Sequence, residues 1–249
     1  MTTVRLAWGG PPDALAKGLA PQNDESRHPA LLVSYVYLEK FMQQRARYGF
    51  TDWCMDSGAF SAFNSGATID LVEYAETCKR MLASDSQLTE VFALDVIGDW
   101  RASEKNTQKL WALGVPAIPV YHPEEPWDVL EGLASDYPKV GIGGVATRLR
   151  GRAAKLRFYE QVFARVWPKK LHGLGLNDEA IMMRLPFHSV DAPSWELGPC
   201  GFGMWKSLGG WLPIRGGQHQ LRPEVEYHLR MEDRLRTRWA SEMEQLEAM

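Results

Sequence analysis

The chain has 249 residues, 45% of them hydrophobic and 24% charged, with a formal net charge of -3 and a pI near 6.1. This length suits one large α/β barrel or two small domains, and the charge excludes an overall basic coat for nucleic acid while leaving room for a local basic groove. No apolar run approaches the roughly 18 to 20 residues of a membrane span, and the N-terminus lacks a signal-peptide pattern, so we expect a soluble cytoplasmic protein.

Short apolar runs alternate with helical patterns along the whole chain. Strands are predicted over 4–8, 31–38, the run ending at Asp56, 91–97, 117–121, 139–146, 170–176 and 188–195. Helices are predicted over 39–48, 68–82, 102–113, 127–133, 151–166, 177–185 and 222–249. A polar loop follows the first strand, and a Gly/Trp-rich loop spans 198–217.

Eight strands alternating with helices over about 250 residues are typical of a closed α/β barrel of the TIM type, (β/α)8, in one domain over 1–249. The helix over 222–249 would pack on this barrel or extend from it. An open doubly wound sheet is the alternative, but no strand leads into a Gly-x-Gly-x-x-Gly turn.

Three of the predicted strands carry an aspartate at or near their carboxyl ends: Asp56, Asp95 and Asp191. In a barrel these ends form the active face, so we expect the three carboxylates to converge. Carboxylates held close raise one another's pKa, and such a cluster supplies both an ionised nucleophile and a protonated acid. The alternative is that Asp56-Ser57-Gly58 is only a turn.

The motifs at these strand ends resemble those of the tRNA-guanine transglycosylase superfamily. Met55-Asp56-Ser57-Gly58-Ala59-Phe60 is similar to its Asp-Ser-Gly-Gly-Phe motif. The segment 141–146, which contains Gly143 and Gly144, is similar to its Gly-Leu-Gly-Gly-Leu-Ala, and 171–175, which contains His172, Gly173 and Gly175, to its Leu-Met-Gly-Val-Gly. The order of the motifs along the chain, from about residue 50 to 195, makes the set more specific than any single motif.

The resemblance implies an enzyme that exchanges guanine in nucleic acid for a 7-deazaguanine base. It implies that Asp191 attacks the anomeric carbon to form a covalent glycosyl-enzyme, that Asp56 shuttles the proton, and that Asp95 accepts the two adjacent N–H donors of guanine. Backbone N–H groups near Gly143 and Gly144 would reach the base carbonyl because no side chain intervenes.

The chain differs from the tRNA enzymes in lacking their clustered cysteine and histidine zinc ligands after the last strand. Its three cysteines, Cys54, Cys78 and Cys200, lie far apart, so we expect incidental or buried thiols, no metal and no organic cofactor. It most resembles the deazapurine DNA-modification transglycosylases of phages and bacterial islands. We therefore expect duplex DNA as the partner, a free 7-deazaguanine base as co-substrate, and extrusion of guanine from the stack.

Other activities remain as alternatives to DNA-guanine exchange. The same chemistry could act on tRNA, or water could replace the incoming base to give a nucleoside hydrolase. Paired carboxylates on a barrel also serve glycoside hydrolases, and a catalytically silent binding barrel is the alternative outside enzymes.

Aromatic and polar residues near the strand ends are candidates for contact with a base. Phe60, Tyr121, Trp195 and Trp205 are candidates for stacking, with ordinary packing as the alternative. His122 and His172 end predicted strands and could contact substrate or be structural, and Ser57 could bind the base or cap the turn.

Basic residues in the loops after the sixth and eighth strands are candidates for phosphate contacts, with a solvated surface as the alternative. They are Arg148, Arg150, Arg152, Lys206 and Arg215. The arginines of the last helix alternate with acids and are expected to form a salt-bridged outer face.

Overall fold

A computed structural model describes residues 2–10, 27–196, 198, 204–207, 210–213 and 221–248. The strands of its main sheet are β1 (Thr3–Trp8), β2 (Ala30–Ser34), β3 (Trp53–Asp56), β4 (Leu88–Val91), β5 (Val120–Tyr121), β6 (Lys139–Ile142), β7 (Lys170–Gly173) and β8 (Ser189–Ala192). The α-helices are α2 (Leu38–Gln44), α3 (Ala59–Ser65), α4 (Leu71–Ser84), α5 (Trp100–Ala112), α6 (Trp127–Asp136), α7 (Val145–Arg148), α8 (Arg152–Val166), α9 (Glu179–Met182), α10 (Ser194–Glu196), α11 (Arg222–Arg238) and α12 (Ala240–Glu247). Two 3-10 helices, η2 (Tyr35–Tyr37) and η3 (Arg45–Arg47), and an antiparallel hairpin of β9 (Met204–Ser207) and β10 (Gly210–Pro213) complete the described elements.

The eight strands form one parallel sheet in the order β4-β3-β2-β1-β8-β7-β6-β5. The sheet curls so that its two edges approach each other, and one isolated parallel bridge joins Phe92 to Ile118 there. Next to this bridge, the Ala93 N–H donates to the Ile118 carbonyl at 2.8 Å. The α/β class and the parallel order are thus confirmed, and the curl is compatible with a TIM-like barrel, but no continuous ladder pairs β4 with β5.

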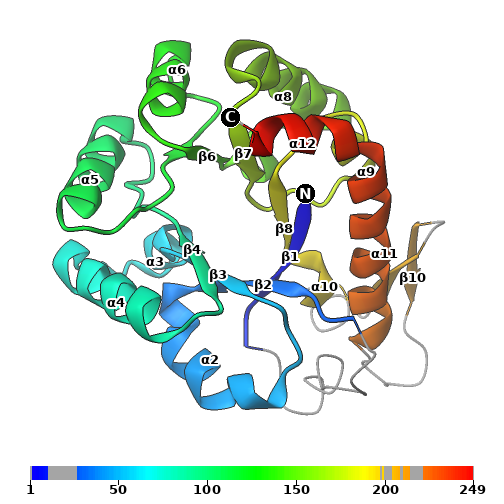
Figure 1. The fold of residues 1–249 in the computed structure, drawn as a ribbon, viewed down its shortest axis with the longest axis horizontal. Coiled ribbons are helices and arrows are strands. Elements are labelled where there is room, and N and C mark those ends of the chain that lie inside the picture. The colour runs from blue at the N-terminus through cyan, green and yellow to red at the C-terminus, as the bar shows by residue number, and fades with distance from the viewer. Residues whose placement is uncertain are drawn as a thin grey trace.

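Helices cover the outside of the curled sheet (Figure 1). The longer helices pack through an apolar face: in α4 the side chains of Tyr74, Ala75, Cys78 and Met81 are buried. The Asp70 side chain begins this helix by accepting the N–H groups of the first turn, which have no partner inside a helix. Apolar burial between the strands and the helices therefore holds the sheet in its curl.

A small cluster of buried apolar side chains lies inside the curled sheet, because alternate residues of a strand point to opposite faces of the sheet. It contains Leu32, Cys54, Phe92, Ile118 and Val120. Such layers fill the interior of parallel barrels, so the centre is packed rather than open. The cavity described below begins where this layer ends.

A buried charged layer lies on the other side of that cluster, toward the amino ends of the strands. Lys139 Nζ lies 2.7 and 2.8 Å from the two carboxylate oxygens of Glu90. Arg5 Nη1 donates to Asp52 at 2.6 Å, and Arg5 Nη2 lies 3.7 Å from Glu90. Opposite charges in contact offset the cost of removing each from water.

Several strands are shorter than the sequence predicts. The strand expected over 31–38 ends at Ser34, and that expected over 91–97 corresponds to β4, which ends at Val91. Asp95 therefore lies in the loop after β4 and not inside a strand. The strands expected over 139–146, 170–176 and 188–195 also end early, because their last residues leave the ladder for loops and for the short helices α7 and α10.

Three further elements differ from the prediction. Helix α3 follows directly after Gly58, whose φ of +77° turns the chain sharply between β3 and the helix. The C-terminal helix is broken at Trp239 into α11 and α12, and the Trp239 indole donates to the Met182 carbonyl at 2.8 Å. Part of the expected loop over 198–217 is the β9–β10 hairpin, while Cys200 and Arg215 lie outside the described residues.

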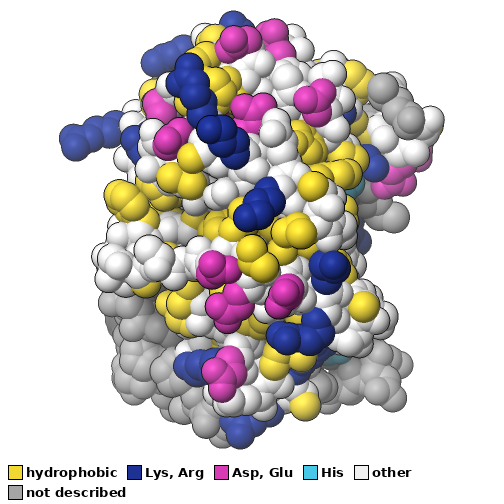
Figure 2. All heavy atoms as spheres, turned by 90° about the vertical axis from the view of Figure 1, so that its left-hand side faces the viewer, with side chains coloured by type: hydrophobic (Ala, Val, Ile, Leu, Met, Phe, Trp, Pro, Cys, Tyr) yellow, Lys and Arg dark blue, Asp and Glu magenta, His cyan; other side chains and the backbone are white. Residues whose placement is uncertain are grey.

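The last helix pair is anchored to the sheet by a buried acid. Glu232, on α11, accepts the N–H of Val4 at 2.7 Å and pairs with Arg27 and Arg236. The arginines of this helix do form ion pairs, as predicted, but Glu232 faces the sheet and not solvent. On the other side of the molecule, where α5 lies, Figure 2 shows Lys and Arg side chains interspersed with Asp and Glu.

Candidate active site

A cavity of about 540 Å³ opens at the carboxyl ends of the strands. Residues at the ends of, or in the loops after, all eight strands of the main sheet line it, as expected for the active face of such a fold. Its lining includes Ala7, Leu32, Ser34, Asp56, Phe60, Asp95, His122, Gly144, Leu174, Asp191 and Glu196. The volume is in the range of small-molecule sites, and the three predicted aspartates all border it.

Two neighbours, the Gly175 backbone and the His172 side chain, hold the Asp191 carboxylate in position. It is on β8, 5% exposed, and its Oδ1 accepts the N–H of Gly175 at 2.8 Å. The same oxygen lies 3.3 Å from His172 Nε2, while His172 Nδ1 lies 2.8 Å from the Ser189 hydroxyl. Burial lowers the pKa of His172 well below its usual value, so the imidazole is neutral. We infer that it donates Nε2–H to Asp191 and accepts from Ser189.

Asp56 ends β3 and shares the cavity with Asp191. Its Oδ2 accepts the N–H of Gly58 at 2.9 Å. Burial raises its pKa to about 6, and the neighbouring Asp191 carboxylate adds to this rise, while the Gly58 hydrogen bond opposes it. Burial also raises the pKa of Asp191 to about 7. Two acids that titrate this close to neutrality can exchange protons with a ligand.

Asp95 differs from the other two aspartates in its partners. The ion pair between its Oδ2 and His122 Nε2, at 3.5 Å, is its single polar contact with the described residues. Burial raises its pKa to about 7, against the lowering effect of His122. A buried carboxylate with unused acceptor positions beside a cavity is suited to binding N–H donors of a ligand.

The glycines after β6 leave space for the His122 side chain as well as for a ligand. A Cβ on Gly143 would lie 2.8 Å from Val120 and 3.0 Å from His122 Nε2, and one on Gly144 would lie 3.0 Å from His122 Cδ2. The Gly143 N–H is already used, because it donates to the Tyr121 carbonyl at 2.9 Å. Of the two predicted base contacts, this leaves Gly144 as the candidate.

Three residues predicted to contact substrate are placed elsewhere. His172 is fully buried beneath Asp191, so it supports the acid and does not face the cavity. Tyr121 is fully buried against Trp127 and Phe158, on the side of the sheet that faces the helices. Gly173 does not line the cavity, and a Cβ there would lie 2.9 Å from the side chain of Leu176.

The aromatic candidates also separate. Phe60, on α3, is 56% exposed and lines the cavity, so it can contact a ligand. Trp195 is fully buried and donates its indole N–H to the Ala7 carbonyl, so its role is packing. The side chain of Trp205 lies outside the described part of the structure. Ser57 is 3% exposed, lines the cavity and remains a candidate contact.

The predicted phosphate contacts are only partly placed. Arg148 lines the cavity and pairs with Glu124 at 2.9 Å. Arg150 is exposed after α7, and Arg152 begins α8. Lys206 lies on β9, with its side chain among the residues that the structure does not describe, as is the whole of Arg215.

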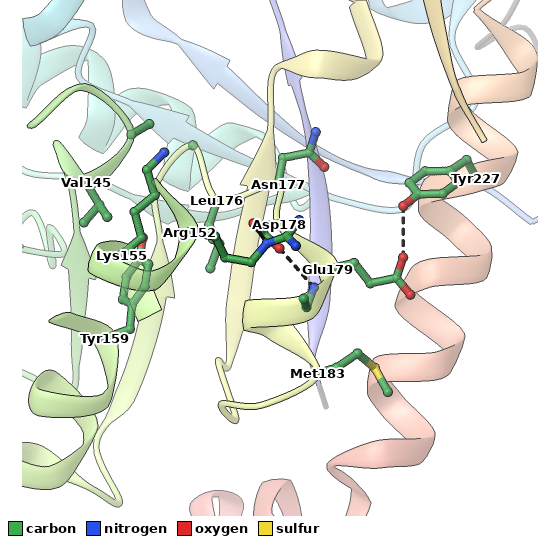
Figure 3. Close-up of a pocket in the computed structure, with 13 residues that line it drawn as sticks. Val145, Arg152, Lys155, Tyr159, Leu176, Asn177, Asp178, Glu179, Met183 and Tyr227 are labelled. Carbon is green, nitrogen blue, oxygen red and sulfur yellow. Dashed lines mark hydrogen bonds and ion pairs between the residues drawn. The ribbon is translucent and has the colours of Figure 1, made fainter. Parts of the chain in front are cut away.

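A second cavity has a volume of about 670 Å³ (Figure 3). It adjoins the first, because Ala146 and Gly175 line both. Arg152 is at its rim and donates to Asp178 at 2.6 Å, and Tyr227 donates to Glu179 across it at 3.0 Å. Lys155 also lines this cavity and forms no ion pair with a described residue. Because Gly175 holds Asp191, the second cavity begins beside the candidate nucleophile.

Sequence reasoning missed two acids, Glu196 and the His122 partner Glu125. Glu196 lines the main cavity, accepts the Gly9 N–H at 2.8 Å, and has its pKa raised by burial. Glu125 lies 3.0 Å from His122 Nδ1. The only sequence signals were acids close behind predicted strand ends, a pattern shared by many surface loops.

The acids and thiols of the described residues are not arranged as a metal site. Among the described residues, no group of three or more His, Cys, Asp or Glu side chains could hold a metal ion. Cys54 and Cys78 are buried, free thiols. None of the described helices combines the length and the apolar character needed to cross a bilayer.

No protein-family model matches this sequence, and a search of curated proteins finds no match either.

Proposed function

We propose that this protein is a DNA-guanine transglycosylase with a (β/α)8 barrel, which exchanges guanine for a 7-deazaguanine base. The observation that carries the proposal is the meeting of Asp56, Asp95 and Asp191, from three distant parts of the chain, around one cavity of about 540 Å³. The motif resemblance supplies the reaction class, and the cavity supports it through the different surroundings of the three acids.

In the proposed first half-reaction, the Asp191 carboxylate attacks C1′ of a deoxyguanosine. A C1′–O bond to Asp191 forms while the C1′–N9 bond breaks, and the departing guanine takes a proton from Asp56. The Gly175 N–H and His172 hold the Asp191 carboxylate in position.

The second half-reaction reverses the first with a different base. The 7-deazaguanine loses its N9 proton to Asp56, its N9 attacks C1′, and the bond to Asp191 breaks, so Asp56 and Asp191 return to their starting states. Asp95 reads the N1–H and the 2-amino group of either base, and the Gly144 N–H is proposed to donate to the base carbonyl. The acid–base steps are assigned to side chains of this chain and to the co-substrate base.

A nucleic acid is proposed as the substrate because the approach to the cavity combines an exposed aromatic ring with nearby cations. Phe60 can stack on an extruded base, which offsets part of the cost of unstacking. Lys155, at the adjoining cavity, and Arg152, which pairs with Asp178 there, are proposed to contact phosphates of the same strand. The preference for DNA over tRNA comes from the resemblance.

The test is an exchange assay with a labelled 7-deazaguanine base, offered with duplex DNA or with tRNA. We expect label in DNA, one guanine released per base incorporated, and a protein–DNA adduct that withstands denaturation in the wild type but not in Asp191→Asn. Label in tRNA alone would change the substrate, and guanine release without incorporation would indicate a hydrolase. Absence of exchange, release and adduct with both nucleic acids would refute the proposal.

A further inference from the structure

His122 is placed between two acids at the edge of the cavity. Its Nε2 lies 3.5 Å from Asp95 Oδ2, and its Nδ1 lies 3.0 Å from Glu125 Oε1. The three side chains are 15%, 10% and 7% exposed, respectively, so water screens this arrangement poorly. The glycines after β6 leave the space that the imidazole occupies.

We propose that His122 is a positioning residue that holds Asp95 ionised and oriented to accept two adjacent N–H donors from a guanine-type base. This inference rests on the proposed function and names the group on which its base selectivity depends. His122 acts through Asp95 and needs no contact of its own with the base.

The charges around His122 favour its protonated form. Burial alone would lower the pKa of His122, but the hydrogen bond to Glu125 and the negative charges of Asp95, Glu125 and Glu124 raise it above its usual value. Arg148 lies on the far side of Glu124, with which it pairs. Both ring nitrogens of the imidazolium are donors, which matches one acid on each side.

The pKa of Asp95 lies close to neutral pH, so a small change in its surroundings changes its charge. Burial, and to a smaller extent Glu125 and Asp56, raise its pKa, while His122 lowers it, and the result is about 7. Without the imidazolium the balance would move further toward the neutral acid. A neutral carboxylic acid carries a hydrogen of its own and cannot accept both N–H groups of guanine equally well.

The geometry also explains why the acceptor positions of Asp95 are free. Asp56 and Asp191 each accept a backbone N–H, whereas Asp95 has only the ion pair with His122 among the described residues. At 3.5 Å this contact is too long for a strong hydrogen bond. The His122 charge therefore favours the ionised form of Asp95, while the carboxylate oxygens stay available as acceptors. The base can therefore compete for both oxygens.

The experiment measures binding of free 7-deazaguanine, and of 7-deazahypoxanthine, which lacks the 2-amino group, by calorimetry between about pH 5.5 and 9. For the wild type we expect a preference for 7-deazaguanine of about tenfold or more, as for a good bidentate contact. The folded, unliganded Asp95 must lose its proton to bind, so affinity should fall as the pH drops through about 7.

In His122→Gln the same profile should move to higher pH by about one unit or more, because an opposite charge next to the carboxylate is lost. Affinity for 7-deazaguanine at pH 7 should drop about fivefold or more and recover toward pH 9. Asp95→Asn should bind weakly, with little preference and little dependence on Asp95 titration. His188→Gln replaces a histidine away from the cavity whose pKa burial lowers to about 3, so it removes no charge over this pH range and should match the wild type.

Two outcomes would overturn the inference while leaving the proposed function standing: a His122→Gln profile that superimposes on that of the wild type, or an equal loss of affinity at every pH, which would indicate a structural role only. Failure of the wild type to bind either base would instead count against the proposed function itself.

Discussion

Replacing Asp191 by asparagine should abolish exchange and stabilise the fold at neutral to alkaline pH. Burial raises the pKa of this carboxyl from 3.8 to about 7 in the folded protein. The folded state therefore binds the proton more tightly than the unfolded chain, and the contribution of Asp191 to stability falls as pH rises from about 4 to about 7. A difference of about three pKa units corresponds to about 4 kcal/mol.

Asparagine removes the charge and keeps an oxygen that can accept the Gly175 N–H. We expect Asp191→Asn to be more stable than the wild type by about 2–4 kcal/mol at pH 8, with a melting temperature higher by about 2–4 °C per kcal/mol. Near pH 4.5 the wild-type acid is protonated in the folded state, so the difference should shrink to below about 1 kcal/mol.

Urea unfolding at both pH values measures this difference, and the exchange assay measures activity on the same preparations. Asp136→Asn, an exposed carboxylate on α6, is the matched control and should change stability by no more than about 0.5 kcal/mol at either pH. A loss of stability of equal size at pH 8 and pH 4.5 would refute the electrostatic reasoning, and retained exchange would refute the role of Asp191 as nucleophile.

Three further predictions concern the pair of acids, the charged layer and the rim. The exchange rate should have a bell-shaped pH profile with its maximum between about 6 and 7. The first step needs Asp191 ionised and Asp56 protonated, so the two acids together must hold one proton, and a flat profile across this range would contradict this requirement. Glu90→Gln should cost about 3 kcal/mol of unfolding free energy at pH 7, because Lys139 keeps its charge in a buried position without its partner. The pKa of Glu90 is lowered to about 2 in the folded protein, so the cost measured by urea unfolding should shrink as the pH falls below about 4.5. Lys155→Gln should reduce the slope of log affinity for DNA against log salt by about 1, whereas Lys105→Gln on α5 should not, and equal slopes would place the strand elsewhere.

The part of the site that lies at strand ends could be predicted from the sequence. Asp56 follows an apolar run and Asp191 lies in the last predicted strand. Parallel strands bring their carboxyl ends to one face, so the order of strands alone was enough to predict that the two acids meet. Asp95 was predicted at this face although the end of its strand was misplaced, because a loop residue just past the strand still reaches the same cavity.

The direction of side chains within a strand could not be predicted in the same way. Strands of a parallel sheet with helices outside are buried on both faces, so their sequences are apolar throughout and do not reveal which alternate residues point inward. Tyr121 points to the helices, whereas its neighbours Val120 and His122 point into the curl. His172 points inward but one layer too deep, because β7 ends at Gly173.

The charged residues near the amino ends of the strands act electrostatically on the acids of the cavity. They help to keep His172, which lies beneath Asp191, neutral. The positive charge of Lys139 and, to a lesser degree, that of Arg5 oppose protonation of His172, in addition to its burial. Arg5 also favours the ionised form of Asp191. A neutral His172 donates one hydrogen bond to Asp191 without forming a tight ion pair, which would reduce the nucleophilicity of the carboxylate. The charge of Arg5 thus offsets part of the cost that burial imposes on the Asp191 anion, while the contact with His172 only orients the carboxylate.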